Sequence, residues 1–81
     1  MRRVQKLKIQ AASLTEALPR GTRVRYWPGS KRDPASIGLI DGPFVIEGGL
    51  TVVCNVKPVW PAGPLGSTVL AVASSHIEKV A

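Results

Sequence analysis

Apolar and polar residues alternate over the first run of the chain, which is the pattern of a half-buried β-strand. Between residues 4 and 10, the apolar Leu7 and Ile9 alternate with the polar Lys6, Lys8 and Gln10. Because successive side chains of a strand point to opposite faces, this alternation predicts a strand whose lysines face solvent. Lysines along an open edge discourage pairing with other chains, so we expect an edge strand.

A short helical turn is expected after this strand. Ser13 and Glu16 have the Ser-x-x-Glu spacing of a capping box, in which each side chain satisfies a free backbone N–H. Leu18 followed by Pro19 ends the segment, which is too short for a stable independent helix. The chain is therefore predicted to divide into an N-terminal arm, residues 1–19, and a body, residues 20–81.

The body has the pattern of an all-β protein. Seven prolines and eight glycines in the whole chain separate short β-branched runs, and Pro43, without an N–H, interrupts one of them. Glu47-Gly48-Gly49 predicts a tight hairpin whose flanking strands pair antiparallel. The expected strands are 23–26, 37–46 with a bend at 41–43, 50–56, 66–72 and 77–80. The expected connections are a polar loop at 28–34, an exposed loop at 57–64 and a single 3₁₀ turn at 73–76. Five short antiparallel strands predict a small closed or nearly closed barrel.

The order of these signals resembles an SH3-like barrel. Residues 21–27, Gly-Thr-Arg-Val-Arg-Tyr-Trp, resemble the Gly-x-x-Val opening strand of that fold, and residues 72–80 resemble its 3₁₀ turn and closing strand. The resemblance covers roughly residues 20–81. More narrowly, Val-Arg-Tyr-Trp-x-Gly, Gly48-Gly49 before Val52-Val53, and residues 75–78 are similar to small uncharacterised proteins of phages and other mobile elements. That group carries no function to transfer.

A second resemblance is to the plasmid-borne type II dihydrofolate reductases, which are SH3-like tetramers. Residues 21–25 and 66–80 are similar to that family's Gly-Asp-Arg-Val-Arg and Gly-Ser through Leu-Glu-Arg-Ile segments. The family's Val-Gln-Ile-Tyr pore strand is replaced here by residues 68–71, Thr-Val-Leu-Ala, without the amide or the phenol. Because function is argued from the site and not from the fold, an enzyme of this type is only a remote alternative.

The chain's length and composition bound its function. Its 81 residues suffice for one domain, and no apolar run approaches the roughly 18 residues of a membrane span. We therefore expect a soluble, cytoplasmic protein without a membrane partner. Cys54 and His76 are the only residues of their types, and no nucleophile–base motif surrounds them. No disulfide, metal, cofactor or catalytic activity is predicted, and Cys54 is interpreted as a small buried hydrophobe.

Charge is the most informative property of the composition. The net charge is +6, and residues 1–34 hold nine basic against two acidic residues, while the remainder holds two against three. A basic N-terminal segment of net charge +7 followed by a near-neutral remainder indicates an anionic partner, either nucleic acid or an acidic host protein. The alternative is that the excess charge only keeps a small protein soluble.

Tyr26 and Trp27 lie among cations, and this is the sharpest candidate site. Aromatic faces flanked by Lys and Arg suit single-stranded nucleic acid, because bases stack on the rings while the cations neutralise phosphates. Strand alternation places Val24 and Tyr26 inward and their basic neighbours outward, whereas Trp27 either stacks with bases or covers the end of the barrel. The predicted nucleic-acid contacts are Arg23, Arg25, Trp27, Lys31 and Arg32, together with Lys6 and Lys8 of the arm.

Trp60, surrounded by prolines, supports a different interpretation. It is either a lid over the barrel or an exposed anchor, and exposed Trp is enriched among residues that dominate binding energy. Trp60 and Trp27 are therefore candidates for protein contact, and the alternative function is a phage or mobile-element module that modulates a host protein. A homo-oligomer is also expected, because the arm strand offers pairing groups that a small barrel does not use.

Overall fold

The computed structural model describes residues 3–60 and 69–80. Within these residues a helix, α1 (Arg3–Ala17), precedes a set of short strands. The strands are β1 (Arg23–Tyr26), β2 (Ser36–Ile40), β3 (Val45–Glu47), β4 (Thr51–Trp60), β5 (Leu70–Ala73) and β6 (Ile77–Lys79). A 3₁₀ turn, η1 (Ser74–His76), leads into β6 as predicted. The described residues include no helix with the length and apolar character that crossing a bilayer requires.

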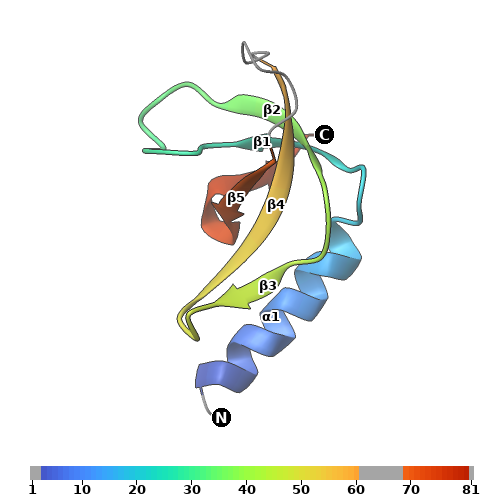
Figure 1. Cartoon of the computed structure of the whole chain (residues 1–81), viewed down its shortest axis with the longest axis vertical. Coiled ribbons are helices and arrows are strands. Elements are labelled where there is room, and N and C mark those ends of the chain that lie inside the picture. The colour runs from blue at the N-terminus through green and yellow to red at the C-terminus, as the bar shows by residue number, and fades with distance from the viewer. Residues whose placement is uncertain (1–2, 61–68, 81) are drawn as a thin grey trace.

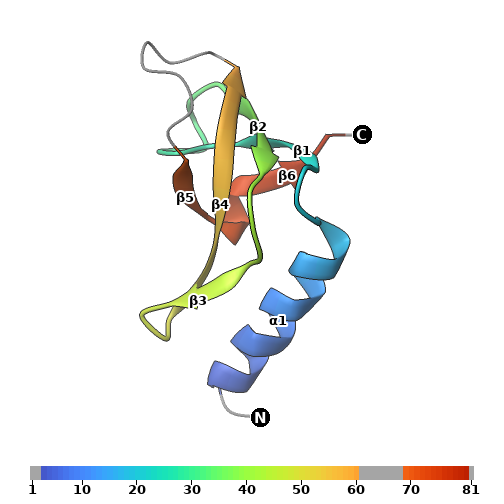
Figure 2. The ribbon, with the colours of Figure 1, turned by 45° about the vertical axis from the view of Figure 1, so that its right-hand side comes forward.

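All strand pairs are antiparallel, and together they form one curled sheet. Its order is β3-β4-β2-β1-β6, with β5 on the other edge of β4. The ten residues of β4 therefore join β2 and β3 on one side to β5 on the other. Figures 1 and 2 show the sheet curling into a half-barrel, with α1 lying across its lower end beside β3. The prediction of a mostly-strand, barrel-like antiparallel fold is confirmed at this level.

Burial alternates along the strands as their sequences predict. In β1, Val24 and Tyr26 are buried while Arg23 and Arg25 are exposed. The core on the inner face of the sheet also includes Ile40, Val52, Cys54, Val56, Val72 and Ile77. The β3–β4 hairpin turns through Gly48 and Gly49, whose φ angles of 62° and 67° lie in the left-handed region that glycine tolerates.

The N-terminal edge strand predicted for residues 4–10 is wrong, because these residues belong to α1. Over the longer window, Leu7, Ala11, Leu14 and Leu18 recur at the helical period, and all four pack in or against the core. Ile9, the second apolar residue of the apparent alternation, is 57% exposed. Gln, Lys, Leu and Ala are good helix formers, so intrinsic propensity acts in the same direction as the longer period.

The predicted capping box is wrong for the same reason, since Ser13 and Glu16 lie inside α1. The polar side chain of this segment that bonds to the rest of the fold is Thr15. Its Oγ1 donates a hydrogen bond to the Ala11 carbonyl at 2.7 Å. The same oxygen accepts the backbone N–H of Phe44 at 2.9 Å, which ties the helix to the bend before β3. With the arm helical, the free strand edge that motivated the expected homo-oligomer is absent from this segment.

The loop predicted to begin at Lys57 starts too early, because β4 continues to Trp60. The register shifts between Ile37 and Gly38, so that Ile37 pairs with Trp60 and Gly38 with Pro58. An irregularity of this kind is where a strand tolerates proline. The rest of that predicted loop and the first residues of the strand predicted at 66–72 lie outside the described residues. β5 begins at Leu70.

Gly38 of β2 lies where neighbouring atoms of β4 and β1 leave no room for a side chain. A Cβ atom at this position would lie 2.6 Å from Val56 Cγ1, 2.8 Å from the Lys57 carbonyl oxygen and 2.9 Å from Tyr26 Cε1. Real Cβ atoms do not approach neighbours so closely, so only glycine fits. Gly38 is buried between Ile37 and Leu39, which are partly exposed, and the absence of a side chain lets β4 and Tyr26 pack against it.

Candidate nucleic-acid interface

The solvent side of β1, β2, β4 and β6 gathers cations and an exposed tryptophan. Arg23 pairs with Leu39, which pairs with Lys57, and Arg25 pairs with Ile37, which pairs with Trp60. Paired residues of an antiparallel sheet point to the same side. We name this surface the outer face; its members are Arg23, Arg25, Ile37, Leu39, Lys57, Trp60 and Glu78.

A shallow hollow of about 500 Å³ lies at one end of the outer face. Its lining is formed by Arg23, Ile37, Val59, Trp60 and Val80. Trp60 is 63% exposed, which is unusual for the largest apolar side chain. The hollow therefore offers an aromatic wall, an aliphatic lining and one guanidinium.

Glu78 is the acidic member of the outer face. Its carboxylate lies 3.8 Å from Arg25 Nη2 and 3.8 Å from Lys31 Nζ. All three side chains are about half exposed, and exposed pairs of this kind contribute little to stability. Arg23 and Lys57 form no ion pair with any other described residue. The outer face therefore has a net positive charge. An anionic ligand that binds Arg25 and Lys31 more tightly than Glu78 does can displace the Glu78 carboxylate.

Trp27 lies in a different environment, where it holds the loop after β1. Its Nε1 donates a hydrogen bond to the Asp33 carbonyl at 3.0 Å, and Lys31 Nζ lies 5.0 Å from the ring centroid. The Trp27 N–H donates to the His76 carbonyl at 3.0 Å, and His76 Nδ1 lies 3.1 Å from the Trp27 carbonyl. Because a carbonyl only accepts, Nδ1 carries the proton in this bond. Lys31 is itself anchored by the Ser75 carbonyl at 3.1 Å.

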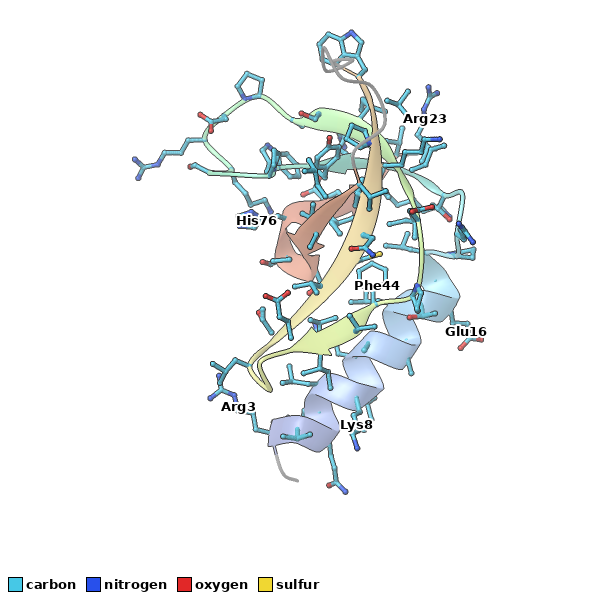
Figure 3. The ribbon with its side chains drawn as sticks, in the orientation of Figure 1. Arg3, Lys8, Glu16, Arg23, Phe44 and His76 are labelled. Carbon is cyan, nitrogen blue, oxygen red and sulfur yellow. The ribbon has the colours of Figure 1, made fainter. Side chains whose placement is uncertain are left out.

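The predicted basic residues divide into two groups. Arg23, Arg25 and Lys31 lie together, and Arg32 is exposed in the same loop as Lys31. Lys6 and Lys8 are exposed on α1, and Figure 3 shows Lys8 and Arg23 at opposite ends of the molecule. The longest dimension is 43 Å, so one small ligand does not contact both groups.

Sequence reasoning missed the association of Trp60 with Arg23. The prolines around Trp60 indicated a loop, whereas the irregular pairing at Ile37 keeps Trp60 in the sheet and on the outer face. One signal was available. Val52, Cys54 and Val56 point into the core, so strand alternation makes Lys57 point to solvent. The end of this strand therefore contributes side chains to the same face as Arg23.

Cys54 is buried, as predicted, with 1% of its surface exposed. Burial, and secondarily the negative charge of Asp41, raise the pKa of its thiol to about 11, so the thiol is protonated and unreactive at neutral pH. Among the described residues, no three His, Cys, Asp or Glu side chains gather in a metal-binding arrangement.

In comparisons with known proteins, the chain matches no family model, no curated protein and no solved structure. Function is therefore inferred from the geometry of the outer face.

Proposed function

We propose that the protein is a non-enzymatic module that binds nucleic acid through its outer face. The observation that carries the proposal is that Arg23, Arg25 and Lys57 share this face with the exposed Trp60. Positively charged side chains neutralise phosphates and so release the counterions condensed on the nucleic acid, while an exposed aromatic ring stacks with bases. Lys31 adds a further positive charge from the neighbouring loop.

We also propose that the barrel is SH3-like and that the protein acts in the cytoplasm. The strand path β6-β1-β2-β4-β5 supports the first point, as does the 3₁₀ turn that leads into the last strand. The outer face lies on the part of this sheet formed by β1, β2, β4 and β6. Binding there needs no cleft between domains and suits a chain of this size.

The test is the paired substitution of Arg23 and Arg25 by Ala, with binding of a fluorescein-labelled oligonucleotide followed by anisotropy over a range of salt concentrations. Binding should weaken for all sequences alike, and the slope of log K against log salt should fall by about 1.4 for single strands, or two phosphates. The matched control is the paired substitution of Lys6 and Lys8 by Ala, which removes the same charge at the other end of the molecule. Equal effects of the two pairs, or no binding of the parent protein at low salt, would show the proposal to be wrong.

Contact with a host protein, centred on Trp60, is the second candidate, and the exposure of Trp60 favours it. Trp27 contributes less to this interpretation than the sequence predicted, because its ring already contacts Lys31 and its Nε1 is bonded to the loop. An interface centred on Trp60 should depend only weakly on salt, whereas phosphate binding should fall steeply. The salt titration therefore separates the two candidates.

A further inference from the structure

The chain has four aromatic side chains, all within the described residues, and their environments differ sharply. Tyr26 and Phe44 are buried in the core. Trp27 is half-buried, with Lys31 over its ring and its Nε1 bonded to the Asp33 carbonyl. Trp60 is the remaining aromatic, and it is 63% exposed. A planar ligand that needs a free aromatic face therefore finds it at Trp60.

The surroundings of Trp60 fit a nucleotide better than a purely apolar ligand. Ile37, Val59 and Val80 supply aliphatic surface beside the indole, and Arg23 supplies a positive charge in the same hollow. Adjacent strands lie about 4.8 Å apart, so β1 with its two arginines lies about 10 Å from β4 across the sheet. A base stacked at β4 can thus place a phosphate over β1.

We infer that Trp60 and the hollow beside it take one unstacked base of a single-stranded nucleic acid, with Arg23 and Arg25 on the adjoining phosphates. The inference rests on the proposed function and names its ligand class. In a duplex, both faces of each internal base are covered by neighbouring bases, so Trp60 gains nothing from it. Duplex binding then depends on the cations alone, while single-strand binding depends on the cations and on Trp60.

The experiment compares three ligands of equal length: a single-stranded oligonucleotide, the corresponding duplex, and an abasic backbone that keeps the phosphates. Trp60→Ala should weaken single-strand binding roughly 5- to 150-fold, the range expected for loss of one stacked base. It should leave duplex and abasic binding unchanged, and Trp60→Phe should retain part of the affinity. Leu50→Ala is the matched control, because Leu50 is 64% exposed just before the other end of β4.

A second measurement does not depend on substituting Trp60. In Trp27→Phe, Trp60 is the remaining tryptophan, and its fluorescence should be quenched by the single strand but not by the abasic backbone. Two outcomes overturn the inference: Trp60→Ala lowers affinity for all three ligands equally, or the single strand binds without quenching. Either leaves phosphate binding by the outer face intact. If none of the ligands binds the parent protein at low salt, the proposed function fails as well.

Discussion

Replacing Gly38 by Ala should strongly destabilise the protein. The added methyl would lie 2.6 Å from Val56 Cγ1, 2.8 Å from the Lys57 carbonyl and 2.9 Å from Tyr26 Cε1. Val56 and Tyr26 are buried, and the carbonyl belongs to the backbone of the paired strand, so none of the three can turn into solvent. We expect a loss of about 3 kcal/mol, the upper end of the usual cost of overpacking a core. For a domain of this size, that lowers Tm by roughly 12–24 °C.

Urea unfolding followed by far-ultraviolet circular dichroism measures this loss. Gly29→Ala is the matched control, because the nearest atom to its added methyl is Asp33 Oδ2, at an ordinary contact distance of 3.7 Å. The control should change stability by less than about 1 kcal/mol, and in the stabilising direction, since Ala restricts the unfolded chain. If Gly38→Ala unfolds within about 0.5 kcal/mol of the parent, β2 and β4 do not pack as closely as described.

Three further predictions concern the outer face, the core and the helix. Glu78→Gln should tighten oligonucleotide binding about two- to fivefold, because the carboxylate competes with phosphate for Arg25 and Lys31; unchanged anisotropy titrations would contradict this. Burial raises the pKa of the Cys54 thiol from 9.0 to about 11, so as pH rises the thiol is deprotonated in the unfolded chain before it is in the folded one. The free energy of unfolding should therefore fall as pH rises above about 9. Cys54→Val should flatten that dependence in urea titrations across pH. Thr15→Val should cost about 1–3 kcal/mol by leaving the Phe44 N–H unpaired, and Thr15→Ser should restore most of it.

The strands were predictable because each carries its own local signal. Val24 and Tyr26 alternate with arginines, and Gly48-Gly49 tolerates the two positive φ angles that a tight hairpin needs, so both the inner face and the hairpin follow from neighbouring residues. The helix was missed because residues 6–10 fit a period of 2 by chance. The apolar positions that contact the sheet appear only over a window of about eleven residues or more.

The candidate site was predictable only in part. The outward direction of Arg23 and Arg25 follows from strand phase, and the structure agrees. The choice between the two tryptophans does not follow from sequence. It depends on Lys31 folding back over Trp27 and on an irregular strand pair that carries Trp60 onto the sheet surface. Lys31 lies only four residues from Trp27, but its position is also set by contacts with Ser75 and Glu78, which are far away in the chain. Ile37 and Trp60 are likewise far apart, so local patterns predict neither arrangement.

The hydrogen bond between Thr15 and Phe44 makes α1 an integral part of the fold. Ala11 and Leu18 belong to the core, and Phe44 is buried with its N–H held by the helix. Removing the helix would expose the core residues that it covers, so the helix is not a dispensable extension of the barrel. Because Thr15 accepts the N–H of Phe44, we expect this amide to exchange its proton with water mainly when α1 separates from the sheet. The rate at which it exchanges measures whether helix and barrel open separately or as one cooperative unit.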